Sequence, residues 1–400
     1  MSKIHLHPIY EPLYLAELSK LPLPTTQDGA HFFSAASQLQ YRGYRDDFGP
    51  LNLACVYRFI EIVEKKIEAH PGHKIVYCAE LGARNLTNAV FLAGAYLILA
   101  KDRTPNQAWA AFRSRYTLLG YRDAADWKCD FRLSVLSCWR GLARAKGLGW
   151  VGRSSKSGTY DMEEYEHYDS AINGELHVVV PGRLIAFRGP RSMPDGRYYR
   201  DAHGGREFGP GYYASVFPTL GVSAVIRLNE PEYDAGAFRD AGIEHHTLPF
   251  PDSAAPSREL VAAFLRVVDR APGVVAVHCR AGLGRTGTLA AVYLMLAHGF
   301  GAREAMGWLR VVRSGCVLGD QQGYLCGVEA RLRGAGLAVG GGEEGDEEGE
   351  RAPEAEHSLA PLEELLAEEG RDPRGDACSE GSDGLGHGPG RCPTRNLSPK

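Results

Sequence analysis

The chain has 400 residues, and 45 Lys and Arg against 49 Asp and Glu give a formal net charge of −4. This balance gives no reason to expect nucleic acid or an anionic membrane as a partner. The polar, proline-containing start and the lack of a long apolar run predict neither a signal peptide nor a membrane span. Nine scattered cysteines without a CxxC pair argue for a reducing compartment and against a disulfide framework or a zinc site. We therefore expect a soluble intracellular protein without a metal or other cofactor.

Glycine-rich breaks and changes of composition divide the chain into four parts. A Gly/Ser/Lys stretch over residues 147–158 marks the main boundary. We predict a first domain over residues 1–150, a linker with a short acidic helix over 151–175, and a second domain over 176–338. The remainder, 339–400, is acidic and rich in Gly, Pro and Ser, which predicts a disordered tail.

The first half begins with about 30 residues that contain several prolines and few strong patterns. Apolar spacing and breaker residues after them predict helices and two strands. The predicted elements, in chain order, are a strand from His31, a helix over 51–69, a strand over 74–78, a helix over 88–100, a helix from Thr104-Pro105, and a helical region from 122 to about 146.

The second half alternates short apolar strands with helical stretches, which predicts a mostly parallel α/β sheet. Its predicted elements are a short helix over 161–171, two strands within 177–189, a helix over 212–220, a strand over 224–228, a helix end at 238–242, a strand over 244–248, a helix over 257–270, a strand over 274–277, and helices over 288–295, over 302–310 and up to about 333.

The most informative stretch is VVAVHCRAGLGRTGT, residues 274–288. A β-branched run is followed by His278 and Cys279, a glycine-rich loop, Arg285, and an apolar stretch without Gly or Pro, which predicts a strand, a tight loop and a helix. Backbone N–H groups at such a helix start converge on one spot and favour an anion there. We place a phosphate-binding loop here, formed by Arg280, Ala281, Gly282, Leu283 and Gly284.

The residue types in this loop indicate nucleophilic chemistry on phosphorus. The loop dipoles, with the hydroxyl of Thr286 or Thr288, favour the thiolate of Cys279, and Arg285 offers a planar fork for two phosphate oxygens. A buried cysteine beside a chance glycine loop is the alternative. It does not explain the full pattern His-Cys-x-x-Gly-x-x-Arg-Thr-Gly, which is the signature of cysteine-dependent phosphatases that form a phosphocysteine intermediate.

Thiolate attack needs a general acid, and Asp252 is the candidate. It lies in a proline-flanked loop upstream of the nucleophile. Its alternative role is a helix N-cap, but Ser257 is better placed for that. Asp252 can later act as the base that activates water, and Gln321 is a candidate for positioning that water, with a simple surface glutamine as the alternative.

A second strand–loop–helix pattern occurs in the first half, where Cys78 and Arg84 stand six residues apart. It is either a second active site or a duplicated fold that has lost its chemistry. We favour the inert reading, because Tyr77 replaces the histidine and Glu80 puts a carboxylate where phosphate would lie.

Five segments resemble the cell-division-cycle-fourteen phosphatases, dual-specificity enzymes of mitotic exit. They are DFGPLNLACVYRF, EEYEHYDSAINGEL, RLIAFRGP, VIRLNEPEYDA and AVHCRAGLGRTGTL, in the family's order over roughly residues 30–330. The resemblance implies two tandem dual-specificity-phosphatase-like domains joined by a linker helix, the first of them catalytically silent. It also implies a groove that favours phosphoserine-proline with a basic residue downstream.

The resemblance assigns the groove to Glu166, Asp169 and Glu175, whose charges would attract a substrate Lys or Arg; a solvated helix face is the alternative, and Asp123 is a weaker candidate. The chain departs from the family's common pattern at Arg280, where lysine is usual, and at Cys316, where serine is usual. Cys316 either forms a disulfide with Cys279 on oxidation or is a bystander.

The leading hypothesis is a phosphatase for phosphoserine/threonine-proline sites made by cyclin-dependent kinases, acting in the nucleus and cytoplasm, with nucleolus, centrosome or spindle suggested by the resemblance. A non-catalytic phosphoprotein scaffold and a phosphoinositide or RNA phosphatase are the alternatives. The sequence leaves the oligomeric state open. In the tail, a leucine-containing segment over 359–366 is either a partner-binding or nuclear-export segment or, as we favour, a plain acidic linker. Ser398-Pro399 is a candidate phosphorylation site or a chance match.

Overall fold

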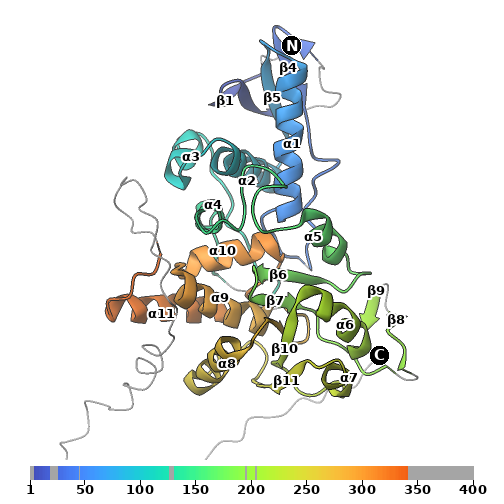
Figure 1. Ribbon diagram of the computed structural model, residues 1–400. Helices are drawn as coiled ribbons and strands as arrows, with labels where there is room; N and C mark the ends of the chain where they lie inside the picture. The colour runs from blue at the N-terminus through green and yellow to red at the C-terminus, as the bar shows by residue number, and fades with distance from the viewer. Residues whose placement is uncertain are drawn as a thin grey trace, which may run out of the picture.

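The computed structural model describes residues 4–18, 26–44, 46–125, 130–193, 196–202 and 205–340. Two α/β units follow each other along the chain, the first in the upper part of Figure 1 and the second in the lower part. The predicted disordered tail beyond residue 340, with its leucine segment and Ser398-Pro399, lies outside the described residues.

The first unit is built on a five-stranded sheet in the order β1-β2-β5-β4-β3. Its central strand, β5, is parallel to both neighbours, and the two edge pairs are antiparallel. The strands are β1 (His7–Tyr10), β2 (Leu13–Leu18), β3 (Thr26–Gln27), β4 (Ala30–Phe33) and β5 (Lys74–Glu80).

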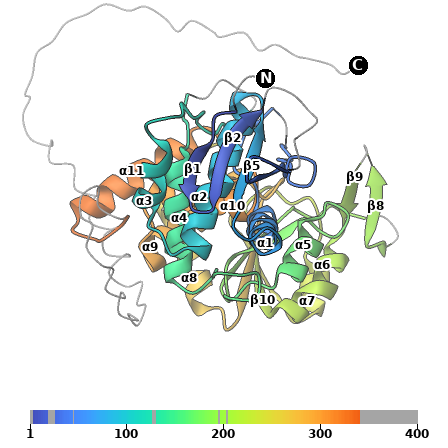
Figure 2. The same cartoon turned by 90° about the horizontal axis from the view of Figure 1, so that it is seen from above.

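The second unit repeats this plan with a five-stranded sheet in the order β11-β10-β12-β7-β6. All pairs are parallel except β6 with β7, which confirms the predicted mostly parallel sheet. A separate hairpin, β8 with β9, lies at the opposite end of this unit from α11 in both views (Figures 1 and 2). The strands are β6 (Leu176–Val180), β7 (Leu184–Phe187), β8 (Tyr199–Ala202), β9 (Gly205–Phe208), β10 (Val222–Arg227), β11 (Glu244–Thr247) and β12 (Val274–His278).

Amphipathic helices cover the first sheet, and one apolar helix lies between them. That helix, α2, has the length and composition of a membrane span, but 78% of it is buried inside the fold, as expected of a core helix. The helices of the first unit are α1 (Leu53–Ala69), α2 (Ala83–Ala100), α3 (Pro105–Phe112) and α4 (Val135–Gly147), and the linker holds α5 (Met162–Asp169).

The helices of the second unit pack against its sheet, and α9 contacts β12, the strand that precedes the phosphate-binding loop. The N-cap of α8 is Ser257, whose hydroxyl accepts a hydrogen bond from the Leu260 N–H at 3.2 Å, so Asp252 is not needed as a cap. The helices are α6 (Pro210–Val216) with the 3₁₀ turn η2 (Phe217–Leu220), α7 (Gly236–Asp240), α8 (Arg258–Arg270), α9 (Gly284–His298), α10 (Ala302–Val312) and α11 (Gln321–Gly334).

The two units meet where α4 packs against α10 (Figure 1). Glycines allow this close approach: a Cβ on Gly307 would lie 2.6 Å from the carbonyl oxygen of Ser137, and a Cβ on Gly141 would lie 2.4 Å from that of Glu304. The largest cluster of buried apolar residues is continuous across this contact and includes residues of both units. Movement between the units would therefore expose apolar surface.

One expectation about the first unit was wrong, and one stretch without a prediction is ordered. The helix predicted from residue 122 begins only at Val135: the described residues 122–125 and 130–134 are not helical, backbone hydrogen bonds join Tyr121 to Leu133, and Ser134 caps the helix. The nearly patternless N-terminal stretch forms β1 and β2, whose strand pairing supplies the order that local sequence does not.

We predict that Gly307→Ala lowers the free energy of unfolding by about 2–3 kcal/mol, because the added methyl meets backbone atoms that cannot rotate away. The matched control is Gly323→Ala in α11, where nothing lies within 4 Å of the new Cβ. There the better helix propensity should raise stability by about 0.5–1 kcal/mol. Urea unfolding of both variants measures the difference; equal effects would contradict a tight α4–α10 contact.

Candidate active site

The phosphate-binding loop connects the end of β12 to the start of α9, as predicted. Cys279 lies directly after the strand and is only 3% exposed. Gly282 has φ +70°, and a Cβ there would lie 2.1 Å from the carbonyl oxygen of Phe187 in β7. Glycine is therefore required at this position, both for the left-handed backbone and for the close approach of the neighbouring strand.

The predicted arginine and the predicted acid meet at this loop. Arg285, 6% exposed, donates to the carbonyl oxygen of Phe250 at 3.0 Å, and its Nε lies 3.4 Å from the Asp252 carboxylate. The Asp252 side chain is 69% exposed. A left-handed Ser253 (φ +62°) gives its N–H to the same carboxylate. Asp252 thus lies beside the arginine and in contact with solvent.

Of the two candidate threonines, only Thr286 has a hydroxyl left for the nucleophile. Its Oγ1 is buried without a hydrogen-bond partner in the described structure, whereas the Thr288 hydroxyl donates to the Gly284 carbonyl oxygen at 2.8 Å. Since a buried hydroxyl without a partner is costly, Thr286 is the residue suited to donate to a thiolate.

His278 is fully buried, and its ring contacts the backbone of Cys279. Burial lowers the pKa of His278 to about 3, so the ring is neutral. Its Nδ1 lies 2.9 Å from the Cys279 carbonyl oxygen, and its Nε2 lies 2.7 Å from the Tyr233 hydroxyl, which in turn contacts His245 at 2.8 Å. In a neutral ring, Nδ1–H donates to the carbonyl and Nε2 accepts from the tyrosine. Neither Tyr233 nor His245 was a candidate from the sequence, although Tyr233 lies in the VIRLNEPEYDA segment.

Gln321 is the first residue of α11 and is fully buried, which excludes the surface alternative. Its amide donates to the Ala254 carbonyl oxygen, in the loop of Asp252, at 3.0 Å. Its Oε1 has no partner among the described residues and lies 2.9 Å from where a Cβ of Gly284 would be. The side chain therefore lies between the acid loop and the phosphate-binding loop.

A second buried arginine, Arg313, forms hydrogen bonds to the backbone of the phosphate-binding loop. It was not among the candidates from the sequence. Its guanidinium donates to the carbonyl oxygens of Gly282 at 2.9 Å and Ala281 at 3.0 Å. It also donates to the Glu175 carbonyl oxygen and contacts His177 Nδ1, both at 2.8 Å. Arg280 is exposed, and its carbonyl oxygen accepts from the Gly189 N–H.

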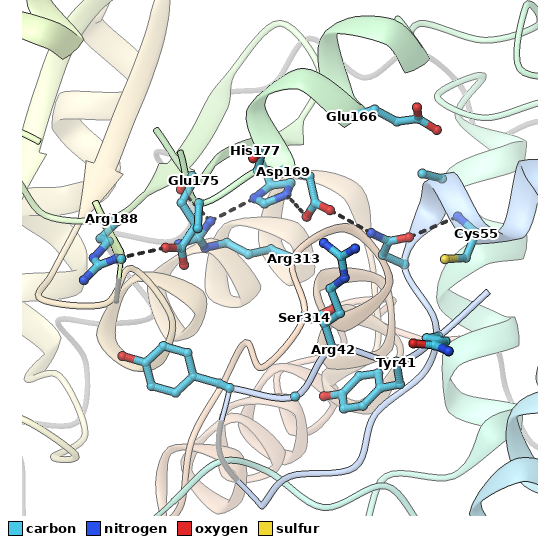
Figure 3. A pocket seen from close by; sticks show the side chains of 18 of the residues that line it. Tyr41, Arg42, Cys55, Glu166, Asp169, Glu175, His177, Arg188, Arg313 and Ser314 are labelled. Atoms are coloured by element: carbon cyan, nitrogen blue, oxygen red, sulfur yellow. Dashed lines mark hydrogen bonds and ion pairs between the residues drawn. The ribbon is translucent and has the colours of Figure 1, made fainter. Parts of the chain in front are cut away.

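A cavity of about 1020 Å³ lies between the two units and extends to the phosphate-binding loop (Figure 3). The first unit supplies lining residues from the segments 37–44 and 52–58, and the linker and second unit supply residues that include Glu166, Asp169, Glu175 and Leu283. The structure therefore brings the three predicted groove carboxylates together at one cavity.

These carboxylates already have partners within the protein. Glu166 forms a two-point ion pair with Arg58 at 2.7 and 2.9 Å, and Glu175 lies 3.4 Å from Arg188. Asp169 accepts from Asn52 at 3.0 Å and from His177 at 2.9 Å. The groove is thus a mixed-charge surface, not a set of free acids, and Figure 3 shows Arg42 extending into it near Asp169.

In the Asp169–His177 pair, only Asp169 is ionised. Burial acts to raise the pKa of Asp169, but the hydrogen bond from His177 and the charge of Arg313 outweigh it and lower the pKa. Burial also lowers the pKa of His177. A neutral His177 therefore donates to an ionised Asp169 and accepts from Arg313.

Three further candidates, Cys78, Cys316 and Asp123, are buried. Cys78 is inside β5 with a buried side chain, burial raises its pKa to about 12, and Arg84 turns outward to Asp46 at 3.7 Å. Cys316 is buried and its pKa is raised by burial to about 11; a disulfide with Cys279 remains a prediction. Asp123, the weaker groove candidate, is buried and does not line the cavity.

Comparisons with known proteins agree with this geometry. Residues 7–145 match the family model "Dual specificity protein phosphatase, N-terminal half", and residues 214–317 match "Swiss Army Knife protein, DSP-PTPase phosphatase domain". The dual specificity protein phosphatase CDC14C of Homo sapiens is 38% identical over 305 residues, covering 76% of this chain and 66% of that protein. CDC14A of Homo sapiens is 38% identical, covering 80% and 53%, and the tyrosine-protein phosphatase CDC14 homolog of Schizosaccharomyces pombe is 32% identical, covering 79% and 59%.

Among solved structures, Tk-PTP in its active form is 26% identical, covers 38% of this chain and 95% of that chain, and gives a TM-score of 0.31. Both matched models describe phosphatase domains of the dual-specificity class, and the fold and the arrangement of the candidate residues agree with that class. Within that class, the chain belongs to the Cdc14 family, as the resemblance of its motifs implied. The chain spans less than two thirds of the length of these curated relatives.

We predict that His278 makes the protein less stable at acidic pH. The unfolded histidine binds a proton below pH 6.5 and the folded one only near pH 3, so stability falls as pH drops through this window. Between pH 7 and 5 this linkage lowers the free energy of unfolding by about 2 kcal/mol. In His278→Asn, which keeps an N–H for the Cys279 carbonyl, urea unfolding should show a correspondingly smaller pH dependence; an unchanged dependence would contradict a neutral buried His278.

Proposed function

We propose that the protein hydrolyses phosphate monoesters on proteins through a phosphocysteine intermediate. The Cys279 thiolate attacks phosphorus, and the bond to the substrate oxygen breaks while Asp252 gives that oxygen a proton. Water then attacks the phosphocysteine, Asp252 takes a proton from the water, and inorganic phosphate leaves with the thiolate restored. The convergence of Cys279, Arg285 and Asp252 at one loop is the observation that carries this proposal.

The other site residues have supporting roles in this scheme. Arg285 holds two phosphate oxygens, with the N–H groups of residues 280–284 around the others. Thr286 donates to the thiolate, His278 fixes the Cys279 carbonyl, and Gln321 positions the attacking water. Two of these roles rest on unpaired buried atoms, the Thr286 hydroxyl and the Gln321 Oε1, which a bound substrate and water would satisfy.

The proposed substrates carry phosphoserine or phosphothreonine followed by proline, with a basic residue downstream, as cyclin-dependent kinases produce. The cavity beside the phosphate-binding loop supports this, since Glu166 and Asp169 line it. At the rim of the cavity, a substrate lysine would form an ion pair with Glu166 beside Arg58. The Arg58 side chain is 55% exposed and can move to make room. We further propose a role in cell-cycle control in the nucleus and cytoplasm, on the strength of the family relationship.

The alternative of a non-catalytic phosphoprotein scaffold needs a phosphate-binding loop but no acid. The position of Asp252 beside Arg285 disfavours it, because a carboxylate there would repel bound phosphate unless it were protonated for proton transfer. A lipid or RNA phosphatase is disfavoured by the apolar Leu283, which is buried within the loop.

We predict that Cys279→Ser abolishes turnover of a phosphoserine-proline peptide, by at least about a thousandfold, while retaining the bound phosphopeptide. Cys78→Ser is the matched control, because Cys78 is buried in the other sheet and its loss should leave kcat unchanged. Steady-state rates and mass spectrometry of quenched reactions measure both variants. Turnover that survives in Cys279→Ser, or no phosphate on Cys279 in the parent, would reject the mechanism.

We predict that Glu166→Gln raises KM about three- to tenfold for a phosphoserine-Pro-x-Lys peptide, because one ion pair at an exposed rim contributes about 1 kcal/mol. A small aryl phosphate does not reach the groove and should be unaffected. Glu163→Gln, on the same helix and exposed outside the cavity lining, is the control. Equal effects on both substrates would remove Glu166 from the groove.

A further inference from the structure

The first unit supplies a buried carboxylate to the loop that carries Gln321. Asp123 is 3% exposed, and its Oδ2 accepts from the Gly319 N–H at 2.5 Å and from the Gln322 side-chain amide at 2.6 Å. Both donors belong to the second unit. A buried carboxylate is stable only when such donors satisfy it, so this contact fixes both partners.

Asp123 is itself held firmly by the first unit. Backbone hydrogen bonds join Arg122 to Phe48 at 2.8 and 3.1 Å and Tyr121 to Leu133 at 2.7 and 3.1 Å. Tyr121 is fully buried. The carboxylate therefore projects from a rigid part of the non-catalytic unit.

Residues 313–322 form the segment that Asp123 contacts, and Arg310 holds its other side. The fully buried Gln322 lies between the two charges, because its Oε1 accepts from Arg310 Nη2 at 2.7 Å. Arg310 also donates to the carbonyl oxygens of Cys316 at 3.0 Å and Val317 at 3.2 Å. The segment is thus fixed by an arginine of the second unit and a carboxylate of the first.

The same segment contacts both reactive loops. The Val317 N–H donates to the Leu283 carbonyl oxygen at 3.3 Å, and the Gln321 amide donates to that of Ala254 at 3.0 Å. Val317 has φ +64°, a conformation that a β-branched residue adopts only when its surroundings impose it. The position of Gln321 therefore depends on contacts around the segment, including those to Asp123.

We propose that Asp123 is a positioning residue, through which the silent unit sets Gln321 and the loop of Asp252 for proton transfer and water attack. This inference rests on the proposed function. Arg313, at the start of the same segment, holds the phosphate-binding loop through side-chain hydrogen bonds of its own, so we expect attack by Cys279 to depend little on Asp123. Loss of Asp123 should affect the steps that use Asp252 and Gln321 and spare the attack on activated esters.

The test is Asp123→Asn, studied by rapid kinetics with p-nitrophenyl phosphate and by kcat/KM with phenyl phosphate, whose leaving group is more basic. We expect a burst rate on p-nitrophenyl phosphate within about threefold of the parent. The steady-state rate of p-nitrophenyl phosphate hydrolysis and kcat/KM for phenyl phosphate should each fall at least about tenfold. This loss is a part of the rate enhancement that a general acid contributes. Asp102→Asn removes an exposed carboxylate of the same unit that pairs with Lys146 and should leave every rate unchanged.

A double-mutant cycle with Asp252→Asn separates positioning from a general structural effect. If Asp123 acts through the acid loop, its effect on phenyl phosphate disappears when Asp252 is already asparagine. Full additivity, an equal loss of burst and steady-state rates, or no loss at all would each overturn the proposal.

If Asp123→Asn does not fold, Gln322→Leu keeps the Gly319 contact and is tested in the same way. It should give the same pattern of rates, and an unchanged kcat/KM for phenyl phosphate would overturn the proposal. Failure of the proposed function would appear separately, as a parent enzyme without a burst or one indifferent to Asp252→Asn.

Discussion

The site depends on the hydrogen bonds between the Arg313 guanidinium and the carbonyl oxygens of Ala281 and Gly282. In a tight loop, carbonyls that are turned outward leave the backbone N–H groups facing inward, where they can surround an anion. The cation is buried, so its full hydrogen-bonding capacity must be met, and the same side chain also contacts Glu175 and His177. One arginine thus couples the shape of the phosphate-binding loop to the groove beside it.

The two units show how one architecture can keep or lose a reactive cysteine. Cys279 lies just beyond its strand, at the start of a loop, whereas Cys78 lies inside β5, which continues to Glu80. A thiol inside a strand is surrounded by apolar neighbours that oppose its ionisation. The first unit instead has a structural part in the molecule. Its helix α4 packs against α10, its residues line part of the cavity, and its Asp123 carboxylate binds the segment that carries Gln321.

Much of the fold and the central part of the site could be predicted from local sequence. The Cys279 loop, the Asp252 loop and the Ser257 cap are short motifs in which neighbouring residues determine the backbone. The strands β1 and β2, and the late start of α4, could not be predicted in this way, because pairing with distant segments decides them. The partners of Glu166, Asp169 and Glu175 were likewise invisible, since a charge run in the sequence does not reveal which arginines fold against it.

The sequence by itself predicted the chemistry, because the candidate nucleophile, its arginine and its glycines lie within the nine consecutive residues 279–287, whose spacing is enough to identify them. Gln321 was already a candidate from the sequence, but only the tertiary structure showed what it contacts and added Arg313, Tyr233 and Asp123 as supporting groups. Arg313, Tyr233, Gln321 and Asp123 reach the site or its supporting segments from separate parts of the chain. Their roles come from burial, since a polar group removed from water must find its partner wherever packing places one.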